Sequence, residues 1–372
     1  MIIVQIVPKL PPKINGLGDY ALNLARQLRQ DFAIETHFIV GDPEWEGAEK
    51  IEGFSVSKVS NRSTEKLLSI LKEQPFTTVL LHYVGYGYAR RGYPLWLINA
   101  LENWLNGANQ SKTLVTMFHE TYAYSNKPWH SSFWFSLLQK KLARKLANLS
   151  NCCVTNREEN TNIISKLTGN RAKKMLTIPV FSNIGEASQS QIRPLQDRKK
   201  RIVVFGHRNT RALAYQQYLP NLEKTCQLLK IDEIYDVGVS TGLNISHIKG
   251  VPVIEKGVIS AVEIQEILLN SLAGFLCHPS PSKLAKSTIF AAYCAHKVIP
   301  IMPEFADQSR LKDGLQVGKN YLTAMTVSQE VQGSNSFLEE GLKIAENAYQ
   351  WYQNHNLSSQ TRIFATQLNA KY

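Results

Sequence analysis

Short apolar runs alternate with longer amphipathic segments along the first half of the chain. Apolar runs typical of buried strands fall at 2–7, 36–40, 78–84, 114–119, 152–155 and 176–180. Segments with apolar residues at helical spacing lie between them, at 19–28, 95–105, 133–149 and 160–167. Strands of four to seven residues that alternate with helices predict βαβ units and a parallel sheet that is buried on both faces.

The alternation stops and then starts again in the second half. The segment 182–201 is polar and ends on a basic run at 198–201, a composition typical of a linker. Further strands are predicted at 202–205, 233–237, 251–254, 274–277, 298–302 and 321–325. Helices are predicted at 213–229, 261–269, 284–296, 337–354 and 358–368.

Two such series predict an α/β fold with two doubly wound, Rossmann-like domains that face each other across a cleft. We place the first domain at 1–185 and the second at 195–345. The remaining segment, 346–372, is predicted to be helical, and one alternative is that it packs back on the first domain. Ligands of open α/β sheets bind beyond the carboxyl ends of the strands, so the functional site is expected there.

Length and composition agree with this organisation. A chain of 372 residues exceeds the usual size of a single hydrophobic core, and 44% hydrophobic with 19% charged residues is a globular balance. The formal charge of +12 fits an anionic partner such as phosphate groups, a membrane surface or nucleic acid, although many proteins are simply basic. No nucleic-acid-binding signature accompanies the scattered basic residues, so we set nucleic acid aside.

The cysteines and the apolar runs bear on location. The five cysteines are odd in number and form no C-x-x-C pair, which favours a reducing cytoplasm and no cysteine metal site. The apolar run at 1–8 is too short for a signal peptide, and no run approaches the length of a transmembrane helix. We therefore expect a cytoplasmic protein.

The first candidate site is the loop from Asn15 to Asp19, between the first strand and the first helix. Gly16 and Gly18 would let backbone N–H groups approach a phosphate at a helix N-terminus. Leu22 stands at the third position of a G-x-G-x-x-G motif, and Asp19 is a possible helix cap. A purely structural glycine turn is the alternative.

Other candidates follow later strands of the first half. His119 and Glu120 come at the end of the strand 114–119, where they would contact sugar hydroxyls or assist proton transfer. The preceding strand ends in an aromatic, glycine-rich turn at 82–88, suited to stacking on a sugar or simply to packing. A surface-loop histidine is the alternative for His119.

Two arginines stand at the corresponding place in the second half. Arg208 and Arg211 follow the strand 202–205 and enter a helix. Guanidinium groups there would neutralise a diphosphate leaving group without a metal ion. The alternative is a pair of solvated arginines.

These residues, in this order, resemble the GT-B glycosyltransferases, in particular the retaining, glycogen-synthase-like class known as family 4. The resemblance covers nearly the whole chain: a glycine-bearing loop after the first strand, a histidine after a middle strand and a basic loop opening the second domain. The run Cys-His-Pro-Ser at 277–280 is similar to the strand end of that class, and 289–299 looks like its alanine-rich helix and following strand.

The chain departs from that class at its two glutamates. Lys283 and Ala291 stand where one glutamate would contact the donor sugar and the other the nucleotide ribose. Lys283, Lys286 and Ser287 instead favour an anion at the start of a helix. The departure leaves the retaining mechanism and the identity of the nucleotide open.

The resemblance implies a metal-independent glycosyltransferase with no cofactor, which moves a sugar from a nucleotide-sugar to a polysaccharide, lipid-linked or small-molecule acceptor. His119 would contact the transferring sugar, and Glu120 would lie on the acceptor side. One alternative is a catalytically degenerate GT-B protein that binds a phosphorylated sugar or nucleotide without turnover. A nucleotide-sugar epimerase is another, on fold grounds alone.

The segment 133–149 adds a question about membranes. Phe135, Leu138, Leu142, Leu146 and Leu149 share one helical face. An adjacent arc carries the basic residues Lys140, Lys141, Arg144 and Lys145. Such a helix suits peripheral contact with the inner face of a membrane. An ordinary domain helix with a core face is the favoured interpretation.

Overall fold

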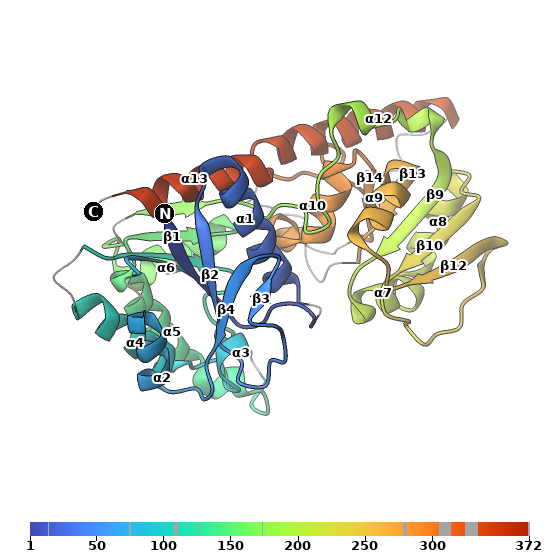
Figure 1. The fold of residues 1–372 in the computed structure, drawn as a ribbon. Coiled ribbons are helices and arrows are strands. Elements are labelled where there is room, and N and C mark those ends of the chain that lie inside the picture. Colours follow the sequence, from blue (N-terminus) through green and yellow to red (C-terminus); the bar gives the residue numbers. More distant parts are fainter. Residues whose placement is uncertain are drawn as a thin grey trace. The chain divides into compact units, whose positions relative to one another are not determined.

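The chain folds into two compact units, each built on a mostly parallel sheet (Figure 1). The computed structural model describes residues 1–13, 15–73, 76–107, 111–125, 127–172, 174–277, 281–304, 314–323 and 334–370. The first unit comprises Met1–Pro179 and Leu357–Tyr372, and the second comprises Val180–Asn356. Two α/β units of this kind confirm the predicted fold class.

The first unit holds an eight-stranded sheet in the order β3-β4-β2-β1-β5-β6-β7-β8. All neighbouring strands are parallel except β3, which is antiparallel to β4. The strands are β1 (Ile2–Val7), β2 (Glu35–Val40), β3 (Lys50–Ile51), β4 (Phe54–Lys58), β5 (Thr78–Tyr83), β6 (Thr113–Phe118), β7 (Cys152–Thr155) and β8 (Met175–Thr177). The helices are α1 (Gly16–Phe32), α2 (Thr64–Glu73), α3 (Gly85–Tyr88), α4 (Leu95–Asn106), α5 (Ser131–Leu149), α6 (Glu158–Thr168) and α13 (Leu357–Asn369).

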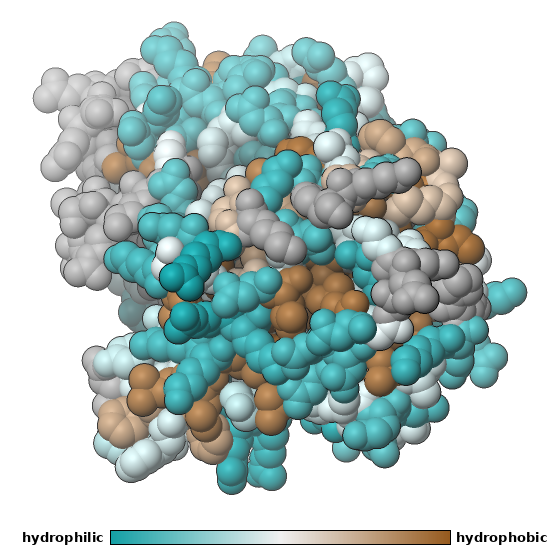
Figure 2. Space-filling model, turned by 90° about the vertical axis from the view of Figure 1, so that its left-hand side faces the viewer, coloured by the Kyte–Doolittle hydropathy of each residue, from teal (hydrophilic) through white to brown (hydrophobic). Residues whose placement is uncertain are grey.

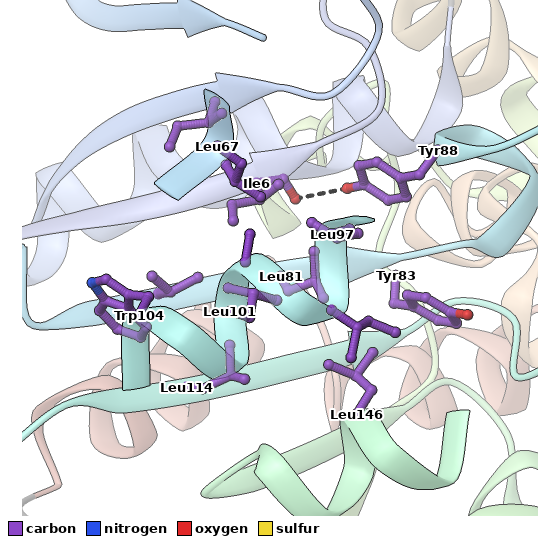
Figure 3. Close-up of a cluster of buried hydrophobic side chains, with 14 of the residues drawn as sticks. Ile6, Leu67, Leu81, Tyr83, Tyr88, Leu97, Leu101, Trp104, Leu114 and Leu146 are labelled. Atoms are coloured by element: carbon purple, nitrogen blue, oxygen red, sulfur yellow. Dashed lines mark hydrogen bonds between the residues drawn. The ribbon is translucent and has the colours of Figure 1, made fainter. Parts of the chain in front are cut away.

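Helices cover both faces of this sheet. On one face, α2, α4 and α5 enclose a core in which Leu81, Leu101, Trp104 and Leu146 lie together (Figure 3). The Tyr88 hydroxyl donates a hydrogen bond of 3.0 Å to the Ile6 carbonyl in the same region (Figure 3). On the other face, α1 and α13 pack against each other and against the strands.

The predicted amphipathic helix 133–149 corresponds to α5. From its predicted apolar face, Leu142 and Leu146 are buried in the core of the first unit. The favoured interpretation, a domain helix with a core face, is therefore confirmed for these positions. Leu138, from the same predicted face, is 38% exposed near the start of the helix, so only the later part of this face belongs to the core.

The second unit holds a seven-stranded sheet in the order β11-β12-β10-β9-β13-β14-β15, parallel except for the β11–β12 pair. The strands are β9 (Lys199–Phe205), β10 (Glu233–Val237), β11 (His247–Ile248), β12 (Val251–Gly257), β13 (Ser271–Phe275), β14 (Ile299–Met302) and β15 (Leu322–Thr323). The helices are α7 (Arg208–Tyr215), α8 (Leu219–Leu228), α9 (Ala261–Leu269), α10 (Thr288–Ala295) and α12 (Ser334–Gln353). Short 3-10 turns lie at η1 (Gln189–Gln191), η2 (Leu195–Asp197) and η3 (Pro281–Lys286).

The segment 182–201 was predicted to be a linker, and this prediction is wrong for its basic end, 198–201, which belongs to the second unit. Arg198 is 7% exposed and donates hydrogen bonds to the carbonyl oxygens of Arg193 and His296, at 3.0 Å each. Burial lowers the pKa of Arg198 to about 10. Arg201 is already part of β9 and donates a 2.9 Å hydrogen bond to the Glu233 carboxylate. This basic run therefore anchors the second unit instead of linking two domains through solvent.

Candidate functional site

Each sheet has one point at which the order of its strands reverses. In the first unit this point lies between β1 and β5, and in the second it lies between β9 and β13. The loops after such a strand pair leave the sheet on opposite faces, so a crevice opens between them at the carboxyl edge. Most of the residues predicted from the sequence lie on the segments that follow β1, β9 and β13. His119 and Glu120 follow β6, next to β5.

A cavity of about 600 Å³ marks this point in the first unit. Its walls come from the segments after four strands, β1, β2, β4 and β5. The lining residues are Pro8, Lys9, Asn15, Gly16, Leu17, Asp42, Glu44, Arg62, Val84, Tyr86 and Gly87. Of these, the sequence pointed to the glycine loop and to the aromatic turn after β5.

Charged side chains in this cavity pair with one another. The Asp42 carboxylate, only 6% exposed, lies 3.3 Å from both Lys9 Nζ and Arg62 Nη2. The Tyr86 ring is 39% exposed. A carboxylate, two cations and an aromatic ring provide acceptors, donors and an apolar face around one space, which suits a polyhydroxylated ring. Sequence analysis missed Lys9, Asp42 and Arg62, although Asp42 lies only two residues beyond the predicted strand 36–40.

The glycine loop forms the first turn of α1. Asn15 caps this helix, and its Oδ1 accepts hydrogen bonds from the backbone N–H groups of Leu17 at 3.1 Å and Gly18 at 3.0 Å. The alternative cap, Asp19, lies inside the first turn instead. Two of the N–H groups that a phosphate would use are thus occupied by a side chain of the protein.

Gly18 has a packing reason to be glycine. A Cβ at this position would lie 2.4 Å from the Lys9 carbonyl oxygen, closer than any real contact. The absence of a side chain therefore lets α1 begin directly against the chain that leaves β1. Gly16, by contrast, is exposed and lines the cavity.

His119 is half-buried and belongs to a chain of polar side chains under α1. His82 Nδ1 lies 3.1 Å from His119 Nε2, and His82 Nε2 lies 2.9 Å from Gln5 Oε1. Gln5 Nε2 in turn donates to Thr36 Oγ1 at 3.4 Å. The Tyr20 ring meets both imidazoles edge-on, and its hydroxyl donates a 2.7 Å hydrogen bond to Gln360 of α13.

This chain of hydrogen bonds determines where the protons are. Because Gln5 uses its amide group on Thr36, its carbonyl oxygen must accept from His82 Nε2–H. His82 is fully buried, and burial holds its pKa well below the usual value, so it is neutral and Nδ1 must accept. His119 Nε2 therefore carries a hydrogen and donates it to His82 Nδ1.

Glu120 is exposed beside this histidine. The backbone N–H groups of His119 and Glu120 both donate to the Tyr83 carbonyl, at 3.0 and 3.5 Å. The end of β6 is thus fixed against the end of β5. These hydrogen bonds hold the backbone of His119 and Glu120 at the carboxyl edge of the sheet.

The two arginines after β9 differ in the second unit. Arg208 is exposed at the first position of α7, and its Nη2 donates to the Thr241 carbonyl at 3.2 Å. Arg211 is 1% exposed; it forms an ion pair with Asp236 and donates a 2.9 Å hydrogen bond to the Gly206 carbonyl. Buried partners occupy the Arg211 guanidinium, so this residue holds the loop, whereas Arg208 remains open to a ligand.

The candidates after β13 gather at the start of α10. Lys283 and Lys286 are half-buried in the turn η3, and Ser287 caps α10 by accepting a 3.2 Å hydrogen bond from the Phe290 N–H group. Ala291, within α10, is 1% exposed. The positions 278–280 of the Cys-His-Pro-Ser run and positions 324–325 of the last predicted strand lie outside the described residues.

The second unit thus brings Arg208, Lys283, Lys286 and the first turn of α10 to the two strands at which its order reverses. Gly206 lets the loop after β9 lie close to α10, because a Cβ at this position would lie 2.2 Å from Ile289 Cδ1. Three cations and a helix N-terminus are suited to an anion. Within the described residues, no group of three or more His, Cys, Asp and Glu side chains could hold a metal ion.

No known family model and no curated protein sequence matches the chain. Solved structures do match it over almost its whole length. Anabaena Alr3699/HepE in complex with UDP-glucose has a TM-score of 0.62 at 13% identity and covers 99% of this chain and 100% of its own. Sucrose-phosphate synthase from Thermosynechococcus elongatus has 0.59 at 10%, covering 99% and 98%. The lipopolysaccharide outer core galactosyltransferase WaaB has 0.58 at 12%, covering both chains completely.

These structures are GT-B glycosyltransferases, and the two α/β units of this chain have the fold of that class. At such low identity the likeness concerns the fold. What the chain does with this fold depends on its own site residues.

Proposed function

We propose that the protein is a glycosyltransferase that moves a sugar from a nucleotide-sugar to an acceptor hydroxyl. The supporting observation is the cationic group in the second unit, where exposed Arg208 and the turn with Lys283 and Lys286 follow the two central strands. A nucleoside diphosphate is the leaving group when a diphosphate-linked nucleotide-sugar gives up its sugar. Stabilising the charge that develops on it supplies most of the acceleration.

In this proposal the bond between the anomeric carbon and the diphosphate oxygen breaks, and a bond from that carbon to the acceptor oxygen forms. Arg208, Lys283 and Lys286 bind the departing diphosphate, and α10 adds the partial positive charge of its first turn. No metal ion is required for this step, so activity in excess EDTA is expected to equal that in buffer alone.

The first unit supplies the groups around the reacting sugar and the acceptor. His119 contacts the transferring sugar, and Glu120 lies on the acceptor side. The cavity around Asp42 and Tyr86 holds the acceptor ring, because its charges are internally paired and its aromatic wall suits a sugar face. Gly16 lines this cavity, whereas the part of Gly18 in phosphate binding is limited by the Asn15 cap.

The first experiment is a thermal-shift titration with UDP, GDP, ADP, CMP and dTDP, followed by assays of nucleotide release from the matching nucleotide-sugars. The HepE structure holds UDP-glucose, so uridine compounds come first. A ligand that binds only the folded protein raises its melting temperature by mass action. Absence of a shift with every nucleotide would refute the proposal.

Arg208→Ala provides the decisive comparison. Losing a charge-assisted hydrogen bond costs about 1.5–3 kcal/mol, so nucleotide affinity should fall by roughly 10- to 150-fold. Lys200→Ala is the matched control, because Lys200 is an exposed cation at the start of β9, whereas Arg208 follows the end of that strand. Equal affinities of the two variants would exclude Arg208 from the site.

The binding-only alternative predicts a different result from the same assays. It rests on Lys283 and Ala291, which stand where the glycogen-synthase-like class that the chain resembles has two glutamates. A nucleotide-dependent shift without release of nucleotide from any nucleotide-sugar, across glycan, lipid-linked and small-molecule acceptors, would favour it over transfer.

A further inference from the structure

Six large apolar side chains lie exposed where the segment after β6 runs into α5. Tyr124, Trp129, Trp134 and Leu137 are 67–77% exposed, and Phe133 and Leu138 are 39% and 38% exposed. We call these six residues the aromatic patch. Single exposed apolar residues are ordinary, but six within residues 124–138 indicate an interaction surface.

The helical part of the aromatic patch belongs to a stripe along the outer side of α5. Phe133, Trp134, Leu137 and Leu138 occupy its first two turns, and the exposed Lys141 and Arg144 continue the same side. The opposite side carries the core residues Leu142 and Leu146. The solvent side of α5 is therefore apolar at its beginning and basic further along.

Hydrogen bonds fix the aromatic patch in place. Trp134 Nε1 donates to the Pro128 carbonyl at 2.7 Å, which ties the preceding segment to the helix. The buried Gln139 accepts from the Ala123 N–H group and donates to the Arg91 carbonyl, both at 2.9 Å. The exposure of the Trp134 ring is thus built into the fold.

Basic residues accompany the aromatic patch along the sequence, although Lys145 is paired with Glu102 at 2.7 Å and the exposed Glu120 precedes the segment. From residue 121 to residue 157 the sequence contains no Asp or Glu, whereas Lys127, Lys140, Lys141, Arg144 and Lys145 fall within that stretch. Lys127 Nζ lies 6.0 Å from the Trp129 ring centroid, and Lys140 Nζ lies 4.8 Å from that of Tyr122. Such mixed aromatic and basic groups are typical of surfaces at a bilayer, where rings sit at headgroup depth and cations meet lipid phosphates.

We propose that the aromatic patch docks the protein on the anionic face of a lipid bilayer. Figure 2 shows one face of the molecule, on which hydrophobic side chains lie among hydrophilic ones. No helix within the described residues is long and apolar enough to cross a membrane, so this is contact from one side.

The aromatic patch adjoins the cavity of the first unit. The Tyr86 hydroxyl lies 3.0 Å from the Ser131 hydroxyl at the start of α5, and Tyr86 lines the cavity. A bilayer bound at this surface would present headgroup-linked sugars beside Asp42 and Tyr86. This one step rests on the proposed function: if the protein transfers a sugar, its acceptor is therefore lipid-linked.

Vesicle flotation with the full-length protein tests the docking surface. With vesicles of 70% phosphatidylcholine and 30% phosphatidylglycerol, we expect binding that salt weakens; with phosphatidylcholine alone, little or none. Trp129→Ser with Leu137→Ser should lower the partition coefficient about tenfold or more, because both side chains are exposed and cost no core packing. Replacing Lys127, Lys141 and Arg144 by alanine should lower it about fivefold per charge.

Val258→Ser with Val262→Ser is the matched control, because both valines are exposed, at 61% and 64%, in the second unit. Unchanged flotation of this control is expected. Equal flotation of the patch variant and the control, or equal binding to neutral and anionic vesicles, would overturn the proposal. A dimeric unaltered protein and a monomeric patch variant would also overturn the proposal, because a second copy of the chain would then cover the surface.

Failure here and failure of the proposed function give different results. Thermal shifts with nucleotides should be the same for the patch variant and the unaltered protein, since the cations of the nucleotide site belong to the second unit. A protein that floats with vesicles but binds no nucleotide would refute glycosyl transfer alone. One that binds nucleotide but does not float would refute docking alone.

Discussion

Arg208 and Arg211 are three residues apart, and their surroundings give them different roles. Arg208 is exposed, whereas Arg211 is enclosed with Asp236. Burying two charges is expensive, and their mutual attraction offsets that cost only while both are present. A charge that loses its partner in such a place is left unpaired in a medium that solvates it poorly.

Arg211→Ala should therefore destabilise the second unit by about 3–5 kcal/mol, since the Asp236 carboxylate remains buried without its partner. Arg208→Ala should change stability by no more than about 0.5 kcal/mol. Thermal and urea unfolding of the two variants measures the difference. Equal stabilities would mean that the Arg211–Asp236 pair does not anchor the loop after β9.

His119 owes its protonation pattern to residues that no ligand touches. The chain through His82 and Gln5 places a hydrogen on His119 Nε2. We expect histidine ¹⁵N NMR at pH 7.5 to show His119 as the Nε2–H tautomer. In His82→Phe that preference should weaken, because the acceptor is gone. A dominant Nδ1–H form in the unaltered protein would contradict the assignment.

At the level of elements, the parallel sheets were the predictable part of the fold. Strands such as β1 and β5 are buried on both faces and therefore form continuous apolar runs. The strand β4 was missed because exposed positions interrupt it and only one face packs. The helix predicted at 213–229 is two helices, α7 and α8, because Pro220 starts the second and cannot lie inside one continuous helix.

The sequence predicted a site residue only where that residue closely follows the end of a predicted strand. His119 and Arg208 were found because each follows a strand in sequence. The partners of these segments were not, because His82 reaches His119 only through the β5–β6 register and Asp236 reaches Arg211 from β10. The cavity of the first unit combines the ends of four strands, one of which was not predicted. Such groupings depend on strand order, which the pattern of one segment does not contain.

The helix α13 contributes a buried polar contact to the first unit from the far end of the chain. Gln360 accepts a 2.7 Å hydrogen bond from Tyr20 of α1 and donates one of 2.7 Å to the Pro179 carbonyl. Gln360→Leu should destabilise the first unit by about 1–3 kcal/mol, because the buried hydrogen bonds to the Tyr20 hydroxyl and to the Pro179 carbonyl would both be lost.

Arg362→Ala is the control on the same helix, since Arg362 is exposed and its loss should be nearly neutral. Hydrogen exchange of α1 measures the effect directly, because its amides open more readily when their cover loosens. If α1 exchanged equally slowly in both variants, the Tyr20–Gln360 contact would not stabilise that helix.

At the scale of the whole molecule, buried histidines make stability depend on pH. His82 belongs to the first unit, and His296 and His355 belong to the second. Burial holds the pKa of His82 well below its usual value and lowers those of His296 to about 4 and His355 to about 3. In the unfolded chain each would take up a proton near pH 6.5.

Below about pH 6.5 the unfolded chain therefore binds more protons than the folded one, and stability falls by up to about 1.4 kcal/mol per pH unit for each histidine. Above that pH these groups are neutral in both states and contribute no slope. Because such histidines occur in both units, every unfolding transition should shift to lower temperature between pH 7.5 and 5.5. His296→Gln removes one protonation site. It should make the change in melting temperature between pH 7.5 and 5.5 smaller for the second unit only. Transitions that do not move between these pH values would mean that the buried imidazoles are protonated inside the fold, and the assignment of a neutral His82 would then be wrong.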